Sequence, residues 1–94
     1  MPAQHTPRHS RHRPQFPNRI REYRLKAGLT QRKLAELLGR RRDAVSSWER
    51  GLSLPSVPRL LRMAKILGTL AEALYRDFYS TFPNEGDQAS PAIA

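Results

Sequence analysis

Cysteine is absent from this chain of 94 residues, and long hydrophobic runs are absent as well. Without cysteine there is no disulfide framework, no cysteine nucleophile and no cysteine-based zinc site, and the composition fits a reducing compartment. No stretch approaches the roughly 18 consecutive apolar residues of a transmembrane helix, and no segment has the apolar centre of a signal peptide. We therefore expect one small domain with terminal tails, located in the cytoplasm.

Acidic residues are scarce. Eight Asp and Glu stand against 17 Lys and Arg, which gives a formal net charge of +9. A surplus of this size favours a polyanionic partner, usually nucleic acid, with a membrane surface as the competing partner. The charge is concentrated between residues 19 and 51, where ten basic residues stand against four acidic ones. Positive charge that served only solubility would not be expected to concentrate in this part of the chain.

Both ends of the chain have few residues that could form a core. Residues 1–18 hold four prolines, three histidines and three arginines with no acid, and they predict a disordered basic arm. Residues 83–94 predict a disordered tail for the same reason. His5, His9 and His12 have a spacing that could place them on one helical face as metal ligands, but the prolines argue against a helix there. We expect no metal site, and a folded domain over residues 19–82.

The residues between the tails show helical periodicity and no strand-like alternation. Glycine follows four apolar-periodic stretches, where a left-handed residue commonly ends a helix, and most stretches open with a favourable N-cap residue. Thr69 and Glu72 have the spacing of a capping box. The predicted helices cover residues 19–27, 31–38, 42–50, 57–67 and 70–80. The glycines are Gly28, Gly39, Gly51 and Gly68, and the expected N-caps are Asn18, Thr30, Ser56 and Thr69.

The helix predicted over residues 42–50 has one apolar face and one polar face. Val45 and Trp48 lie on the apolar side and are expected in the core. The polar stripe, which follows the run Arg40-Arg41-Arg42, consists of Asp43, Ser46, Ser47 and Arg50. The core residues expected from the other helices are Leu34, Ala35, Leu38, Leu60, Met63, Ala64, Leu67, Leu70, Leu74 and Phe78. Two helices joined by a short turn after Gly39 have the layout of a helix-turn-helix, whose second helix fits the DNA major groove.

Several short motifs in this region carry a family resemblance. The strings are Leu29-Thr30-Gln31, Leu34-Ala35, Leu38-Gly39, Val45-Ser46, Trp48-Glu49-Arg50-Gly51, Pro55-Ser56 and Leu67-Gly68. Together they resemble the Cro/C1-type helix-turn-helix family of phage repressors and bacterial regulators, from about Ile20 to Leu74. The resemblance implies an all-α, compact five-helix bundle of the lambda-repressor-like type. It also implies a transcriptional regulator of bacterial or phage origin that binds double-stranded DNA, with repression favoured because it needs only occupancy of a promoter.

The resemblance also implies roles for single residues. Gln31 is expected to touch a phosphate or to support the reading helix, and Arg50 is expected near phosphates at the far end of that helix. Arg24 and Glu49 match a salt bridge that links the first helix to the third. The positions that meet bases or the flanking backbone are Arg41, Arg42, Asp43, Ser46 and Ser47. Arg40 and Arg41 depart from the family pattern and make the start of the reading helix more basic. The run Arg40-Arg41-Arg42 is expected to contact DNA, and a solvated charged loop is the alternative.

The last predicted helix also departs from the family. The family prefers other residues at its start, so a register shifted by one residue stays open. An aromatic run continues beyond the usual domain and either closes the small core or forms a dimer interface. The residues assigned to that interface are Tyr75, Tyr79 and Phe82.

Other function classes have weaker support. We find no nucleophile–base pair and no glycine loop that would cradle a phosphate, so we expect no enzyme and no cofactor. The chain has no room for a ligand-sensing domain, so no small-molecule ligand is expected. An antitoxin or adaptor that binds DNA together with a protein partner is the alternative to a repressor that acts as a homodimer. An RNA binder would want exposed aromatic residues, whereas Trp48 points inward.

Overall fold

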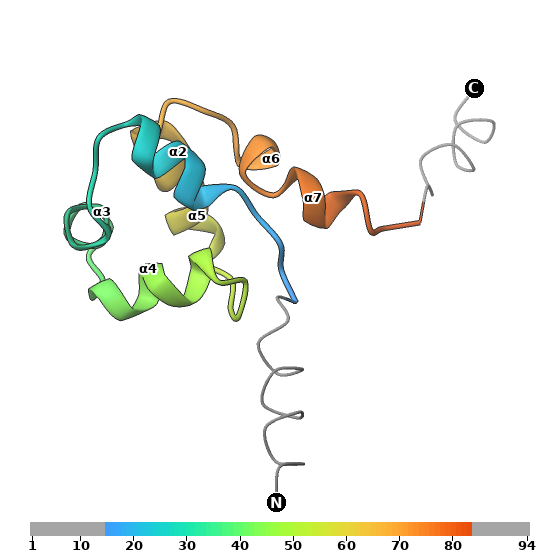
Figure 1. The fold of residues 1–94 in the computed structure, drawn as a ribbon, viewed down its shortest axis with the longest axis horizontal. Helices are drawn as coiled ribbons and strands as arrows, with labels where there is room; N and C mark the ends of the chain where they lie inside the picture. The colour runs from blue at the N-terminus through green and yellow to red at the C-terminus, as the bar shows by residue number, and fades with distance from the viewer. Residues whose placement is uncertain (1–14, 84–94) are drawn as a thin grey trace, which may run out of the picture.

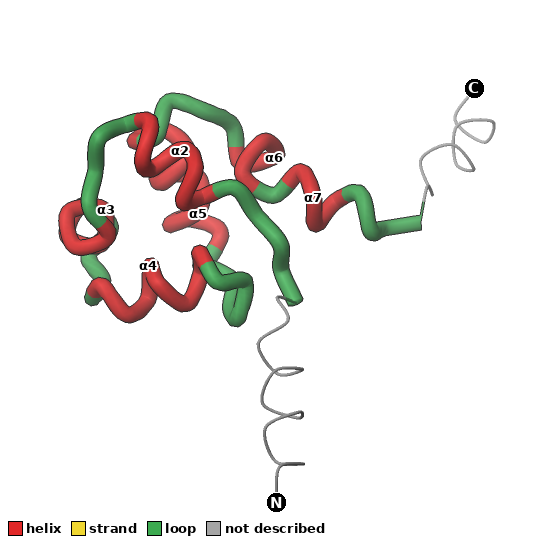
Figure 2. Tube along the Cα trace, in the orientation of Figure 1, coloured by secondary structure: helices red, strands yellow, loops and turns green. Residues whose placement is uncertain are grey.

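The computed structural model describes residues 15–83, which form short helices and, within that range, no strand (Figures 1 and 2). The helices are α2 (Ile20–Lys26), α3 (Gln31–Leu37), α4 (Arg42–Glu49), α5 (Val57–Ile66), α6 (Ala71–Leu74) and α7 (Arg76–Tyr79). The all-α class predicted from the sequence is confirmed. Most of the expected arm and tail, residues 1–14 and 84–94, lies outside the described residues.

The helix ends follow the local chemistry of the sequence. The hydroxyl of Thr30 accepts a hydrogen bond from the backbone N–H of Lys33 at 3.0 Å, which caps α3. Ser56 caps α5 in the same way. At the end of α3, Gly39 has a φ of +68°, and the next N–H, that of Arg40, donates to the carbonyl of Ala35 at 2.9 Å. A residue with a Cβ would be strained in that conformation, so Gly39 lets the chain turn sharply into α4.

The core lies where α2, α3, α4 and α5 meet. Fully buried side chains come from each of these helices, among them Ile20, Leu34, Val45 and Met63. Trp48 is only 3% exposed, which confirms that α4 turns this residue inward. The Nε of Arg59 in α5 donates to the carbonyl of Leu38 at 3.2 Å, so α5 also holds the C-terminal end of α3. The core and α5 therefore hold the two helices of the helix-turn-helix on their inner side.

The single helix predicted over residues 70–80 is wrong: the structure has two short helices, α6 and α7, that meet at Tyr75. Tyr75 has φ −116° and ψ 28°, outside the helical region. The carbonyl of Leu74 accepts a hydrogen bond from the backbone N–H of Arg19 at 2.7 Å. In a continuous helix that carbonyl would bond the N–H of Phe78, so the contact with Arg19 interrupts the helical pattern.

The predicted start of that segment is also wrong. The N-cap is Leu70 rather than Thr69, and no side-chain hydrogen bond caps α6, so the capping box does not form. Leu70 is 68% exposed and does not join the core. The alternative register, shifted by one residue, is the one observed. Thr69 and Glu72 have the spacing of a capping box, but the backbone N–H of Thr69 donates to the carbonyl of Ala64 at 2.9 Å, so Thr69 belongs to the end of α5.

The ordered domain begins earlier in the chain than residue 19, where the sequence placed the boundary between arm and domain. Residues 15–18 already pack on the domain, because the N–H groups of Gln15 and Phe16 both donate to the carbonyl of Gly51 at 3.0 Å. The ring of Phe16 meets that of Phe78 edge to face at 5.3 Å. Asn18 donates from its Nδ2 to the carbonyl of Trp48 at 2.8 Å. Because prolines surround these residues, the sequence did not predict that they form a short ordered segment that holds the end of α4.

Candidate nucleic-acid interface

The structure brings most of the predicted site residues together along the outward face of α4. Arg42 and Asp43 stand in its first turn with side chains 53% and 85% exposed. Ser46 and Ser47 are half-buried on the same stripe, and Arg50 is exposed at its end. Arg41 is the N-cap of α4 and forms no side-chain cap. The result is a helix whose outer face carries short side chains in the middle and charged ones at both ends.

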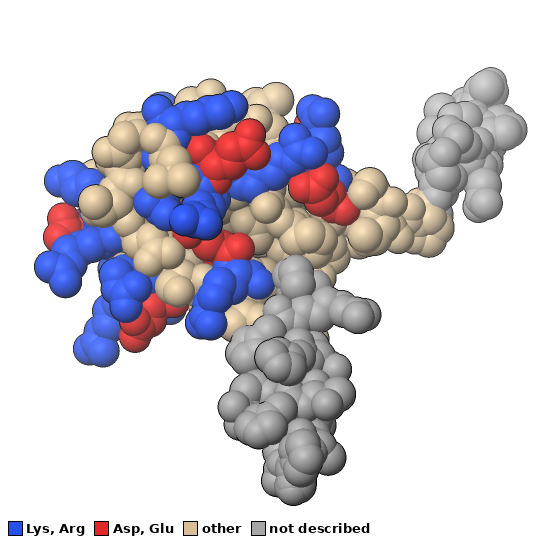
Figure 3. Space-filling model, viewed as in Figure 1, with Lys and Arg blue, Asp and Glu red and all other residues tan. Residues whose placement is uncertain are grey.

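Basic side chains gather around this helix. In Figure 3 they project along the side of the molecule where α3 and α4 lie in Figure 1, with few acidic residues between them. The exposed basic residues of α3, the turn and α4 are Arg32, Lys33, Arg40, Arg41, Arg42 and Arg50. A duplex carries one negative charge about every 1.7 Å along its axis, so a surface of this kind attracts it at any sequence.

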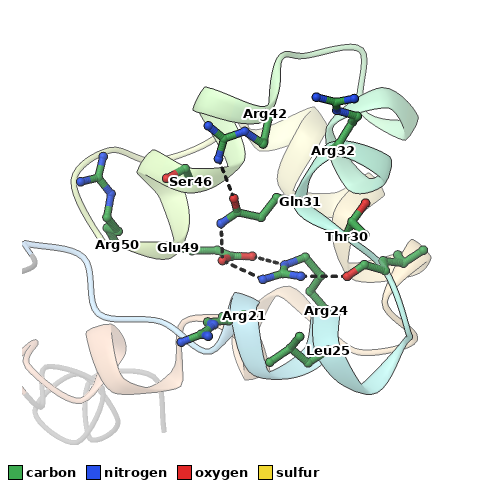
Figure 4. Close-up of a pocket in the computed structure, with 11 residues that line it drawn as sticks. Arg21, Arg24, Leu25, Thr30, Gln31, Arg32, Arg42, Ser46, Glu49 and Arg50 are labelled. Carbon is green, nitrogen blue, oxygen red and sulfur yellow. Dashed lines mark hydrogen bonds and ion pairs between the residues drawn. The ribbon is translucent and has the colours of Figure 1, made fainter.

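A buried ion pair supports α4 from the inside. The Nε of Arg24 in α2 donates to Oε2 of Glu49, and its Nη2 donates to Oε1 at 3.3 Å (Figure 4). The side chains are only 8% and 4% exposed. The Nη1 of Arg24 also donates to the carbonyl of Leu29 at 2.8 Å. The pair that the resemblance implied is therefore present, and it ties α2, the α2–α3 loop and the end of α4 together.

Gln31 connects this ion pair to the surface. Its Nε2 donates to Oε1 of Glu49 at 2.9 Å, and its Oε1 accepts a hydrogen bond from Nη1 of Arg42 at 3.1 Å (Figure 4). Both polar ends of the amide are thus occupied within the protein. Gln31 therefore links the first turn of α4 to its last residue, and its expected role toward DNA stays a prediction. It holds the Arg42 guanidinium over the outward face of α4.

Two hollows flank α4 and divide the predicted residues between them. Arg42, Ser46 and Arg50 line the first hollow, together with residues of α2 and α3. The second hollow is lined by Arg40, Arg41, Asp43 and Ser47 among others. The hydroxyls of Ser47 and Ser53 are 2.7 Å apart, which fixes the loop after α4 against the helix. The exposed ridge of α4 thus stands between two depressions, and arginines contribute to the lining of both.

Sequence reasoning missed two residues of the first hollow. Arg21 of α2 and Arg32 of α3 are both exposed and line it, Arg32 on the side of Arg42 and Arg21 on the far side of the Arg24–Glu49 pair (Figure 4). Nothing in the spacing of α2 alone points to Arg21. Arg32 directly follows Gln31 at the start of α3, and that position was the only signal that could have found it. Both guanidinium groups extend the basic surface beyond α4.

The aromatic run divides between the core and the surface. Tyr75 is only 3% exposed and packs inside the domain, so its ring is removed from the stripe expected at a dimer interface. Tyr79 and Phe82 are 47% and 50% exposed. Their rings meet edge to face at 5.8 Å, and Phe82 also meets Phe78 at 4.9 Å. The core-closing alternative therefore holds for Tyr75, and an aromatic surface remains at Tyr79 and Phe82.

Two titratable groups near this segment are shifted from their ordinary values. The hydrogen bond from Arg19 lowers the pKa of Asp77, and the same contact raises the pKa of Arg19. Burial raises the pKa of the Tyr75 hydroxyl, which has no hydrogen-bond partner among the described residues. Residues 15–83 contain no group of three or more His, Asp or Glu side chains placed to hold a metal ion. His5, His9 and His12 lie outside the described residues.

Comparison with known proteins agrees with this geometry. The family model described as helix-turn-helix matches residues 20–74, which run from α2 to the end of α6. The chain belongs to the Cro/C1-type helix-turn-helix family. A helix-turn-helix relative from Archaeoglobus fulgidus, described as an uncharacterized HTH-type transcriptional regulator, is 37% identical over 57 residues. The match covers 61% of this chain and 81% of that relative, and no solved structure gives a significant match.

Membership defines the general activity of this helix-turn-helix protein. The family consists of DNA-binding transcriptional regulators and is typically non-enzymatic. The pair α3–α4 with the turn at Gly39 lies within the matched residues and forms the surface described above. None of the helices in the described range is long and apolar enough to cross a membrane.

Proposed function

We propose that this helix-turn-helix protein recognises a specific double-stranded DNA site with α4 in the major groove and represses transcription by occupying that site. The observation that carries the proposal is the fixed guanidinium of Arg42. It stands at the start of α4 and is held by Gln31, which is held in turn by the buried Glu49. N-terminal residues of a recognition helix are those that reach base edges.

Arg42 has the chemistry for reading guanine. One N–H of its guanidinium is directed to Gln31, and the remaining N–H groups can reach the O6 and N7 acceptors of guanine. A side chain already held in place loses less conformational freedom on binding than a free one. Ser46, one turn further along α4, is short enough to let the helix approach the groove.

The surrounding arginines supply contacts of a second kind. Arg21, Arg32 and Arg50 line the same hollow as Arg42 and can bond phosphates on either side of the groove. Arg40 and Arg41 extend this surface at the turn before α4. Phosphate contacts fix the position of the protein on the duplex without selecting a sequence, so we assign specificity to α4 and general affinity to these arginines.

A competition assay tests the proposal. Duplexes selected from a random pool by the wild-type protein are compared with a random duplex, for the wild type, Arg42→Ala and Arg62→Ala. Arg62 is an exposed arginine of α5 and serves as the matched control for charge. We expect Arg42→Ala to weaken binding to the selected duplex by roughly 1–3 kcal/mol while changing binding to the random duplex less. Equal losses on both duplexes, or selection of no duplex by the wild type, would refute the proposal.

Assembly as a homodimer is part of the same proposal. A single domain of this size contacts few base pairs, and dimers of such proteins read two half-sites one helical turn apart. Tyr79 and Phe82 are supported as interface residues by their exposure and by the way their rings pack together. Aromatic side chains with this exposure make good interface anchors.

Sedimentation tests the assembly. We expect two chains per palindromic duplex for the wild type and weaker association for a Tyr79→Ser/Phe82→Ser double variant. A complex of one chain per palindromic duplex at saturating protein would refute the dimer. A second protein that co-purifies in stoichiometric amount would instead favour the antitoxin or adaptor alternative.

A further inference from the structure

Asp43 places a negative charge on the basic surface that we propose contacts DNA phosphates. It stands in the first turn of α4, its side chain is 85% exposed, and arginines precede it at three consecutive positions. Its contact with Arg42 is loose, at 3.7 Å between Oδ1 and Nη2. A carboxylate that faced the DNA backbone would repel it, so a residue here must either avoid the duplex or meet a hydrogen-bond donor.

The position of Asp43 on α4 favours the second possibility. It lies in the same helical turn as Arg42, on the stripe that continues through Ser46 and Ser47. In the major groove the exocyclic amines of cytosine and adenine are the donors, and a carboxylate accepts readily from N4 of cytosine. We propose that Asp43 is a specificity-determining residue that accepts a hydrogen bond from N4 of a cytosine in the bound site.

The contact with Arg42 restricts where that cytosine lies. The two groups lie 3.7 Å apart, so the bases that they contact while they remain neighbours must lie close together. The guanine read by Arg42 and the cytosine read by Asp43 therefore belong to the same base pair or to neighbouring ones. This inference rests on the proposed function, because it requires that α4 enters the major groove.

A structural role for Asp43 makes a different prediction. An acidic residue in the first turn of a helix interacts favourably with the helix dipole, and α4 lacks a side-chain cap that could do this instead. If that were its only role, replacement would lower the melting temperature and would leave base preference unchanged. The two roles are therefore separated by measuring preference and stability on the same variants.

The experiment uses the duplex selected by the full-length wild-type protein, with every base pair replaced in turn. Binding to this panel is measured for the wild type, Asp43→Ala, Asp43→Asn and Glu36→Ala, and each variant is checked by thermal unfolding. Glu36 is an exposed acid on the neighbouring helix α3, paired with Lys33 at 4.0 Å, and it controls for the loss of one negative charge. Asp43→Asn keeps the size of the side chain and removes its negative charge.

We expect the wild type to prefer cytosine at one position by roughly 5- to 150-fold, the range of a good base contact. Asp43→Ala should bring that preference close to unity while binding random DNA as tightly as the wild type or more tightly. Asp43→Asn should move the preference toward adenine, which asparagine recognises through N6 and N7. Glu36→Ala should keep the wild-type preference.

The outcomes distinguish a failure of the Asp43 assignment from a failure of the proposed function. If the wild type selects a duplex but Asp43→Ala retains the full panel of preferences, the assignment of Asp43 is overturned and the proposed function stands. If Asp43→Ala weakens binding to every duplex equally, the assignment is overturned as well. If the wild type selects no duplex, the proposed function fails and this inference fails with it.

Discussion

Replacement of Glu49 by glutamine tests whether the buried ion pair holds the reading helix. The carboxylate of Glu49 is 4% exposed and accepts hydrogen bonds from Arg24 and Gln31. A glutamine has one acceptor oxygen where the carboxylate has two, so its amide group must face a donor of Arg24 or Gln31. Arg24, at 8% exposure, also loses its counter-charge.

The expected loss is large for a domain of this size. Removal of one partner from a buried ion pair costs about 3–5 kcal/mol, because it leaves an uncompensated buried charge. Glutamine retains some hydrogen bonding, so we expect a loss of about 3 kcal/mol. A domain of this length has a total unfolding free energy of only about 3–10 kcal/mol. The melting temperature should therefore fall by about 12–24 °C.

Urea unfolding at low temperature, followed by circular dichroism, measures the change. Glu36→Gln is the matched control, because Glu36 is 62% exposed and its pair with Lys33 is worth at most about 1 kcal/mol. A double-mutant cycle with Arg24→Leu and Glu49→Leu should show a coupling energy of about 2 kcal/mol. A midpoint for Glu49→Gln that shifts no further than the midpoint for Glu36→Gln would refute the reasoning.

Three further predictions concern the C-terminal helices and the support of Arg42. Tyr75→Phe should raise the free energy of unfolding by about 1 kcal/mol, because it removes a buried hydroxyl without a hydrogen-bond partner. Burial raises the pKa of Tyr75, so the wild type should lose stability above pH 10, and this component should be missing in Tyr75→Phe but present in the control Tyr79→Phe. Asp77→Asn should lower the melting temperature slightly at neutral pH. Because Arg19 lowers the pKa of Asp77, the difference in melting temperature from the wild type should vanish as the pH falls below about 4. A difference that stays constant with pH would show that the charge of Asp77 plays no part. Gln31→Ala should leave binding to random DNA nearly unchanged and should weaken binding to the selected duplex, which a competition assay measures; an equal loss on both would mean that Gln31 contacts a phosphate.

The helix-turn-helix could be predicted from the sequence because its signals are local. Thr30 and Gly39 mark the two ends of α3, and the alternation of apolar and polar residues in α4 places Trp48 inside and Ser46 outside. Each of these signals depends on residues a few positions apart. Local propensity and core packing agree there, so a single sequence was sufficient.

The C-terminal helices could not be predicted in the same way, because a contact between distant residues decides them. The backbone N–H of Arg19 bonds the carbonyl of Leu74, and the two residues are more than 50 positions apart in the chain. The same limit applies to Phe16, whose partner Phe78 lies near the other end of the domain. Periodicity gives no information on such pairs, so the break at Tyr75 and the ordered segment before α2 were both missed.

The residues of the candidate site came from helix geometry and from the family resemblance, and their role in DNA binding stays a prediction. The spacing of Arg42 and Ser46 on one stripe followed from helix geometry, and the pairing of Arg24 with Glu49 came from the family resemblance. The hydrogen bonds of Gln31 to both Glu49 and Arg42 required coordinates, because Gln31 lies on α3 and its two partners lie at opposite ends of α4. Arg21 and Arg32 were missed for the same reason.

The central claim, that Arg42 reads a guanine in the major groove, is tested most directly by changing one atom of the DNA. Each guanine of the selected duplex is replaced in turn by 7-deazaguanine, which lacks the N7 acceptor but keeps Watson–Crick pairing. We expect one position where this change weakens wild-type binding by roughly 5- to 100-fold and has little effect on Arg42→Ala, which has already lost the contact. The same loss for both proteins at every position, or no loss at any guanine for the wild type, would contradict it.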